Sequence, residues 1–149
     1  MTTLTFPASG PCRAESDLWR LPPDGRAAFV LRERVVAQLR GWHLAELGPD
    51  LALIASELAG NAVRYGRPPI WANLQVMTGP GHRESVRLVV ADFGPGFAVD
   101  EIVRSWPLSG TSRSEHGRGL LLVDALAGDW GSEVRPPLSL TWADLPAVG

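Results

Sequence analysis

Residues 56–66 read SELAGNAVRYG, and this stretch decides the fold. It ends an apolar-periodic segment that predicts a helix over residues 51–65, opened by the Gly-Pro-Asp of residues 48–50. Glu57 and Asn61 are four residues apart and therefore share one face of that helix. The face borders the apolar arc, so a carboxylate and an amide would line a pocket there. The alternative is a solvated polar stripe with a side-chain hydrogen bond.

The segments around this helix predict a two-layer α/β sandwich. Apolar residues three and four apart predict an earlier helix over residues 26–42, capped by Asp24, and a later one over residues 117–127. Alternating or β-branched runs predict strands over residues 16–21, 70–77, 86–91, 130–135 and 138–144. The order of these elements favours one mixed, mostly antiparallel sheet that is covered by helices on one face.

The composition is that of one globular domain. The 149 residues are 45% hydrophobic and 20% charged, with a net charge of −2. We expect residues 1–15 to form a mobile N-terminal tail and residues 16–149 to form the domain. No apolar run is long enough to span a bilayer and no basic cluster suggests nucleic-acid binding, so we expect neither partner. The single cysteine, Cys12, and the lack of a secretory pattern favour the cytoplasm.

Two further motifs contain glycines. Residues 92–96 read DFGPG after a buried strand, where Asp92 can accept a hydrogen bond from an exocyclic amine. Gly94 and Gly96 would let the backbone approach a ligand, although a simple turn also explains this motif. Residues 116–120 read HGRGL before an apolar helix. Free backbone N–H groups at a helix N-terminus bind anions, but Gly-x-Gly alone is a weak signal.

Together and in this order, the three motifs resemble the N, G1 and G2 boxes of the GHKL ATPase superfamily. The resemblance covers about residues 17–145 and is closest to the bacterial anti-sigma factor serine/threonine kinases. It implies a Bergerat ATP-binding fold, with ATP and Mg²⁺ as cofactors. No phosphoacceptor-histidine helix or receiver domain precedes the motifs, so we do not expect a complete sensor histidine kinase.

The resemblance also implies a role for each motif residue. Asn61 would bind Mg²⁺, and Glu57 would orient or deprotonate the attacking hydroxyl. Asp92 would recognise the adenine N6 amine, with Gly94 and Gly96 beneath the nucleotide. The phosphates would be contacted by the G2 residues, Gly117, Arg118 and Gly119, and a mobile lid would span residues 97–116.

Two departures from the family pattern bear on catalysis. Glu115 stands where these kinases often have an arginine, which leaves Arg113 or Arg118 to neutralise charge on the γ-phosphate. The sequence contains no lysine that could do so. The late Gly-Thr of the family is also absent, and residues 137–142 read PLSLTW instead. Because one arginine can contribute about 10³-fold or more to phosphoryl transfer, catalysis tolerates such losses less well than binding does.

Three functions therefore stay open at the level of sequence. The first is a serine/threonine kinase that acts on a small anti-sigma antagonist protein. The second is a non-catalytic, nucleotide-dependent module that sequesters a partner, such as a sigma factor. The third, an ATPase without a protein substrate, is disfavoured because no added domain couples hydrolysis to work. Relatives of the first kind are often homodimers, and the sequence leaves the oligomeric state of this chain open.

Overall fold

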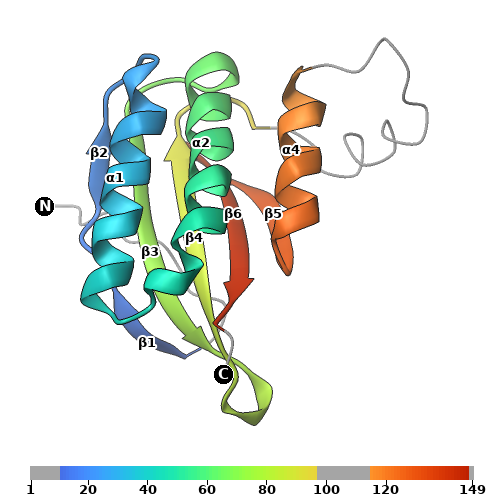
Figure 1. The fold of residues 1–149 in the computed structure, drawn as a ribbon. Coiled ribbons are helices and arrows are strands. Elements are labelled where there is room, and N and C mark those ends of the chain that lie inside the picture. Colours follow the sequence, from blue (N-terminus) through green and yellow to red (C-terminus); the bar gives the residue numbers. More distant parts are fainter. Residues whose placement is uncertain (1–10, 97–114, 148–149) are drawn as a thin grey trace, which may run out of the picture.

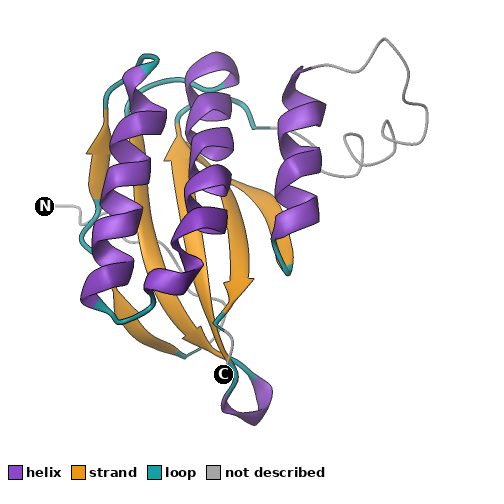
Figure 2. Ribbon diagram, in the orientation of Figure 1, coloured by secondary structure: helices purple, strands orange, loops and turns teal. Residues whose placement is uncertain are grey.

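The computed structural model describes residues 11–96 and 115–147, with the backbone alone in residues 115–118. Within these residues, three α-helices lie on one face of a six-stranded sheet, as Figures 1 and 2 show. The two-layer α/β sandwich predicted from the sequence is therefore confirmed. None of the described helices is both long and apolar enough to cross a bilayer.

The helices are α1 (Arg26–Gly41), α2 (Gly48–Tyr65) and α4 (Glu115–Leu126), with short 3₁₀ turns η1 (Ala45–Leu47) and η2 (Pro80–His82). The strands are β1 (Cys12–Glu15), β2 (Trp19–Leu21), β3 (Ile70–Thr78), β4 (Glu84–Asp92), β5 (Asp129–Arg135) and β6 (Leu138–Pro146). In Figure 1, α1 and α2 lie next to each other over the sheet, and α4 lies beyond α2.

The sheet has the order β1-β3-β4-β6-β5, and β2 also pairs with β3. Every pair among the described strands is antiparallel. The β3–β4 and β5–β6 hairpins meet where β4 pairs with β6. This pairing places the end of β4 next to the start of β6, which is where the candidate site forms.

The core lies between the helices and the sheet. Both long helices present fully buried apolar side chains to it, which include Leu31 and Leu39 of α1 and Leu51 and Ile54 of α2. Burying one such side chain stabilises the fold by about 1.5–3 kcal/mol, so α2 is held firmly against the sheet. The carboxylate of Asp24 accepts a hydrogen bond of 2.9 Å from the backbone N–H of Arg26, as expected of the cap of α1.

The N-terminal segment differs from the prediction. Cys12–Glu15, assigned to a mobile tail, form β1, and the strand expected over residues 16–21 is limited to Trp19–Leu21. The nine-residue β3 is long enough to pair with both short strands. Between them, the backbone N–H of Ser16 donates to Leu74 O, and its Oγ accepts from the Leu74 N–H, each at 2.9 Å. The chain therefore stays bonded to β3 across the break.

Helix α2 begins at Gly48, three residues before its predicted start. Pro49 explains the difference, because proline is compatible with the first turn of a helix, where its missing N–H has no partner to lose. The expected lid, residues 97–116, lies outside the described residues except for the first two residues of α4.

Candidate functional site

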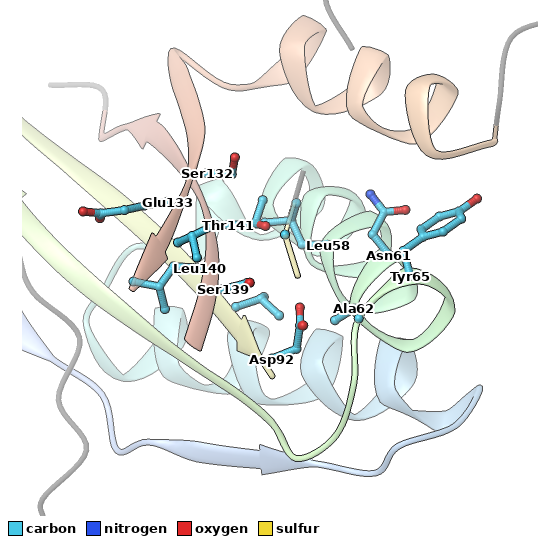
Figure 3. Close-up of a pocket in the computed structure, with 14 residues that line it drawn as sticks. Leu58, Asn61, Ala62, Tyr65, Asp92, Ser132, Glu133, Ser139, Leu140 and Thr141 are labelled. Carbon is cyan, nitrogen blue, oxygen red and sulfur yellow. The ribbon is translucent and has the colours of Figure 1, made fainter. Parts of the chain in front are cut away.

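A pocket of about 490 Å³, including its open mouth, lies between the C-terminal half of α2 and the adjoining ends of β4, β5 and β6 (Figure 3). Three of the residues singled out from the sequence line it, Asn61 from α2 and Asp92 and Gly96 from the second motif. The fold thus brings the first two motifs to one pocket, although 30 residues separate them in the chain.

Asp92 is the last residue of β4 and follows the alternation of Leu88 and Val90, which face the helices. Its Oδ1 accepts hydrogen bonds from the backbone N–H groups of Gly94, at 2.6 Å, and Arg67, at 3.3 Å. Among the described residues, none donates a hydrogen bond to Oδ2. The carboxylate therefore has one oxygen fixed by the backbone and one available to a ligand.

Burial raises the pKa of the Asp92 carboxyl above its ordinary value of 3.8, against the opposing effect of the hydrogen bonds from Gly94 and Arg67. Desolvation destabilises the ionised form, and a donor from a ligand would offset that effect. An exocyclic amine is such a donor. The chemistry expected of Asp92 from the sequence is therefore compatible with its surroundings.

The glycines around Asp92 leave room for close packing. A Cβ on Gly94 would lie 2.8 Å from the Gly66 Cα and 2.9 Å from Asp92 Oδ1. Gly96 has a φ of 78°, in the left-handed region that favours glycine, and its Cβ would lie 2.8 Å from a methyl carbon of Val134. Gly66, which closes α2, belongs to this group but was treated from the sequence only as a helix end.

Three hydroxyl-bearing residues that the sequence motifs did not indicate also line the pocket, Ser132 on β5 and Ser139 and Thr141 on β6. Figure 3 shows Ser139 near Asp92, its cross-strand partner, and Thr141 pairs with Val90. The Ser139 Oγ donates a hydrogen bond of 2.6 Å to the Gly94 carbonyl. The alternation of side chains along β6 could have indicated both β6 residues, because Ser139 and Thr141 are on the same face of the strand as the buried Ala143.

Asn61 lines the pocket, whereas Glu57, one turn earlier on α2, lies outside the lining, where α2 faces α4. Asn61 is only 7% exposed, and its Oδ1 accepts a hydrogen bond from Arg64 Nη2 at 3.4 Å. Its buried Nδ2 has no hydrogen-bond partner within residues 11–96 and 119–147. A solvated stripe is therefore the wrong interpretation for Asn61. A Cβ on Gly119 of α4 would lie 2.5 Å from Glu57 Oε2 and 3.8 Å from Asn61 Oδ1. The first and third motifs thus also meet.

The residues present are compatible with Mg²⁺. The described part of the chain contains no group of three or more His, Cys, Asp or Glu side chains that could hold a metal. Mg²⁺ does not need such a group, because in nucleotide sites it takes one or two protein oxygens and completes its shell with phosphates and waters. The Asn61 Oδ1 is the atom that would hold it, because this oxygen accepts one hydrogen bond, from Arg64, and has a second lone pair.

Arg64 is a cation that the sequence motifs did not indicate. It is exposed on α2, bonded to Asn61 Oδ1, and its guanidinium lies 5.8 Å from the Tyr65 ring centroid. Because residues three apart on a helix are neighbours, the spacing from Asn61 could have indicated that Arg64 lies beside it. The two arginines named from the sequence are not placed, since Arg113 and the side chain of Arg118 lie outside the described residues.

The backbone of the G2 residues forms the first turns of α4, with Gly117 two residues after its start and Gly119 two further on. The helix thus begins two residues earlier than predicted and includes the motif. Only the first N–H groups of a helix lack intrahelical partners, so Gly117 can offer its N–H to a phosphate, whereas Gly119, the fifth residue of α4, cannot do so in this conformation. Contacts from Gly117, Arg118 and Gly119 to a nucleotide stay a prediction.

The sequence profile of one protein family, described as the histidine kinase-like ATPase domain, matches residues 24–138. No protein of curated function gives a significant match. Among solved structures, the histidine kinase domain from Erythrobacter litoralis EL346 blue-light activated histidine kinase is 22% identical, over 69% of this chain and 48% of that chain, with a TM-score of 0.44. The chain thus spans about half the length of that solved chain. The profile match includes all three motifs and most of the chain, and the protein therefore belongs to the histidine kinase-like ATPase family, within the GHKL superfamily.

Proposed function

We propose that this protein binds Mg·ATP and transfers the γ-phosphoryl group to a serine or threonine of a small antagonist protein, as anti-sigma factor kinases do. One observation carries the proposal. Glu57 and Asn61 lie together against Gly119, while Asn61 and Asp92 line one pocket. A carboxylate and an amide thus lie together against α4, and the amide shares a pocket with Asp92, the acid proposed to bind adenine.

This arrangement supports one orientation of the nucleotide. Asp92 Oδ2 would accept the hydrogen bond from the adenine N6 amine at the floor of the pocket. The phosphates would extend toward Asn61, whose buried Nδ2 lacks an acceptor and whose Oδ1 would bind Mg²⁺. Arg64 lies beside Asn61 and would add positive charge at the same end. In this orientation the positive charges of Mg²⁺ and Arg64 would face the negative phosphates, and the Asp92 carboxylate would face the adenine amine that donates to it.

The transfer itself needs a base near the hydroxyl group. The hydroxyl oxygen of the substrate would attack the γ-phosphorus, the bond from that phosphorus to the β–γ bridging oxygen would break, and ADP would leave. The hydroxyl proton would pass to the Glu57 carboxylate. Glu57 lies one helical turn before Asn61, so it would stand next to the metal-bound phosphate and away from the adenine ring.

The rival function is a non-catalytic binding module that holds a partner, such as a sigma factor, only when nucleotide is bound. The observation that favours it is the scarcity of cations. Arg64 is the one arginine that the described structure places in contact with Asn61. Phosphoryl transfer depends strongly on charge neutralisation, where one arginine contributes about 10³–10⁵-fold. For catalysis, Arg113 and Arg118 would have to supply the remaining positive charge at the γ-phosphate.

A single-turnover assay with Mg·ATP labelled on the γ-phosphate tests the kinase proposal. The acceptors are candidate antagonist proteins encoded near this one, and the variants are Glu57→Gln and a control, Glu33→Gln, an exposed acid on α1. Glu57→Gln should bind ATP within about threefold of wild type but transfer phosphate about 10²–10⁴-fold more slowly. The control should behave as wild type in both.

Two results would overturn the proposal at different levels. Wild-type protein that binds Mg·ATP and a partner tightly, yet transfers no phosphate, would establish the binding module. Wild-type protein that binds neither ATP nor ADP in calorimetry would remove the nucleotide function altogether.

A further inference from the structure

Gly119 of α4 lies buried against the side chain of Glu57 on α2. A Cβ at Gly119 would fall 2.5 Å from Glu57 Oε2, closer than real Cβ atoms approach another heavy atom. The Asn61 Oδ1 would be 3.8 Å away, at ordinary contact distance. The space that the missing side chain leaves is therefore occupied by the Glu57 carboxylate and not by the amide.

The backbone of Gly119 does not itself call for glycine. Its φ is outside the left-handed region, and the residue lies inside a helix, where alanine is favoured over glycine. A glycine inside a helix usually has a packing or functional reason. Here the reason that the structure offers is room for the carboxylate of Glu57.

We propose that Gly119 is a positioning residue for Glu57, which keeps the carboxylate beside Asn61 by leaving it the space between α2 and α4. The proposal rests on the proposed function, in which Glu57 is the base. The carboxylate is the free end of a flexible side chain, so a methyl group at residue 119 would displace it rather than separate the helices. The fold and the nucleotide pocket would persist, and the base would be misplaced.

The functional test compares Gly119→Ala with Gly48→Ala, a control glycine on α2 whose Cβ would meet nothing within 4 Å. Mg·ATP is the probe and water is the acceptor. The water oxygen bonds to the γ-phosphorus, the bond to the bridging oxygen breaks, and the proton passes to Glu57. At saturating Mg·ATP, Gly119→Ala should release phosphate about 100-fold more slowly than wild type, because a displacement of about 1 Å has such an effect. A Gly119→Ala protein with the wild-type rate would overturn the proposal.

A second measurement does not depend on catalysis. Thermal unfolding is measured for four proteins: wild type, Gly119→Ala, Glu57→Ala and the double variant. The Tm shift that Gly119→Ala causes is then compared with the Glu57 carboxylate present and absent. With the carboxylate removed, the preference of helices for alanine should raise the Tm by about 2–4 °C. In the wild type the rise should be smaller or reversed, since the methyl group and Glu57 compete for one space.

The two measurements separate the two ideas. Equal Tm shifts in both proteins would show that Gly119 and Glu57 are not coupled and would overturn the positioning role. Wild-type protein that releases no phosphate and phosphorylates no acceptor would overturn the kinase proposal instead, whatever the Tm shifts.

Discussion

Gly66 lies directly against the carboxylate of Asp92, so that a Cβ on Gly66 would fall 2.5 Å from Oδ1 and 2.6 Å from Oδ2. The two residues belong to different layers, since Gly66 closes α2 and Asp92 ends β4. Hydrogen bonds join them through Arg67, whose backbone N–H donates to Asp92 Oδ1 and whose carbonyl accepts from Phe93 N–H at 2.8 Å. The turn after α2 is therefore part of the end of the pocket that Asp92 lines.

Gly66→Ala should weaken ATP binding about tenfold or more, because the methyl group would displace the Asp92 carboxylate and remove a charge-assisted hydrogen bond. Calorimetry with ATP measures the loss. The control is Gly41→Ala, at the end of α1, where a Cβ would meet nothing within 4 Å. Equal ATP affinity in the Gly66 and Gly41 variants would show that Asp92 does not bind the nucleotide from its observed position.

Asp92→Asn should have opposite effects on affinity and on stability. The amide oxygen can still accept from Gly94 and Arg67, but an amino group would replace the free oxygen, and ATP binding should weaken about 10- to 100-fold. The ligand-free variant should be more stable than wild type at neutral pH, because a desolvated charge is removed. Calorimetry and thermal unfolding measure the two effects.

The stability difference should also depend on pH. The pKa of Asp92 is raised in the folded protein, so between 3.8 and its raised value the folded state binds more protons than the unfolded state does. Wild-type stability due to this group therefore falls as the pH rises through that interval, and then levels off. Asp92→Asn should lack the fall, so its advantage should grow as the pH rises above 3.8 and should be larger at neutral pH than at pH 3.8. An advantage that is constant over this range would contradict the burial effect.

Asn61→Ala should reduce the gain in ATP affinity that Mg²⁺ produces. The variant loses the proposed oxygen ligand and also the buried Nδ2, which has no hydrogen-bond partner among the described residues, so folding should be nearly unaffected. Titrations of ATP with Mg²⁺ and with EDTA, on wild type and variant, measure the gain. If Mg²⁺ strengthens binding to both proteins equally, Asn61 is not the ligand.

Arg64→Ala should weaken ATP binding more than ADP binding, because its guanidinium lies beside Asn61, where the terminal phosphate is proposed to lie. Loss of one charged hydrogen bond corresponds to a roughly tenfold or larger reduction for ATP. Arg34→Ala, an exposed arginine on α1, is the matched control and should change neither affinity. Equal losses for ATP and ADP would place Arg64 away from the γ-phosphate.

The layers of the fold could be predicted from the sequence because its periodicities are strong. The apolar spacing of α1 and α2 and the β-branched run of β4 give element types that packing then keeps. The N-terminal strand could not be predicted in the same way. β1 exists because β3 offers it unpaired backbone groups, and that partner is 60 residues away.

The motif residues could be located from the sequence, but their surroundings could not. Asp92 was identifiable because a polar residue continued the inward phase of a buried strand. Gly66 and Ser139 could not be identified in this way, because each contacts the second motif only in the folded protein. Gly66 lies against Asp92, and Ser139 donates a hydrogen bond to the Gly94 carbonyl. Arg64 was overlooked because it lies within the first motif itself, where it reads as an ordinary exposed helix residue.

Helix α2 carries both Glu57 and Asn61, whereas Asp92 is on the sheet. The axial spacing of the first two is about 6 Å and is fixed by helix geometry. The span from Asn61 to Asp92 instead depends on the thickness of the side-chain layer between α2 and β4, to which Leu58 and Val90 contribute. Substitutions that thicken or thin this layer would therefore change which length of phosphate chain fits between the adenine proposed at Asp92 and the metal proposed at Asn61. The spacing between Glu57, the proposed base, and Asn61, the proposed metal ligand, would be unaffected. The length of nucleotide that the pocket accepts and the geometry of the proposed transfer step could therefore change independently.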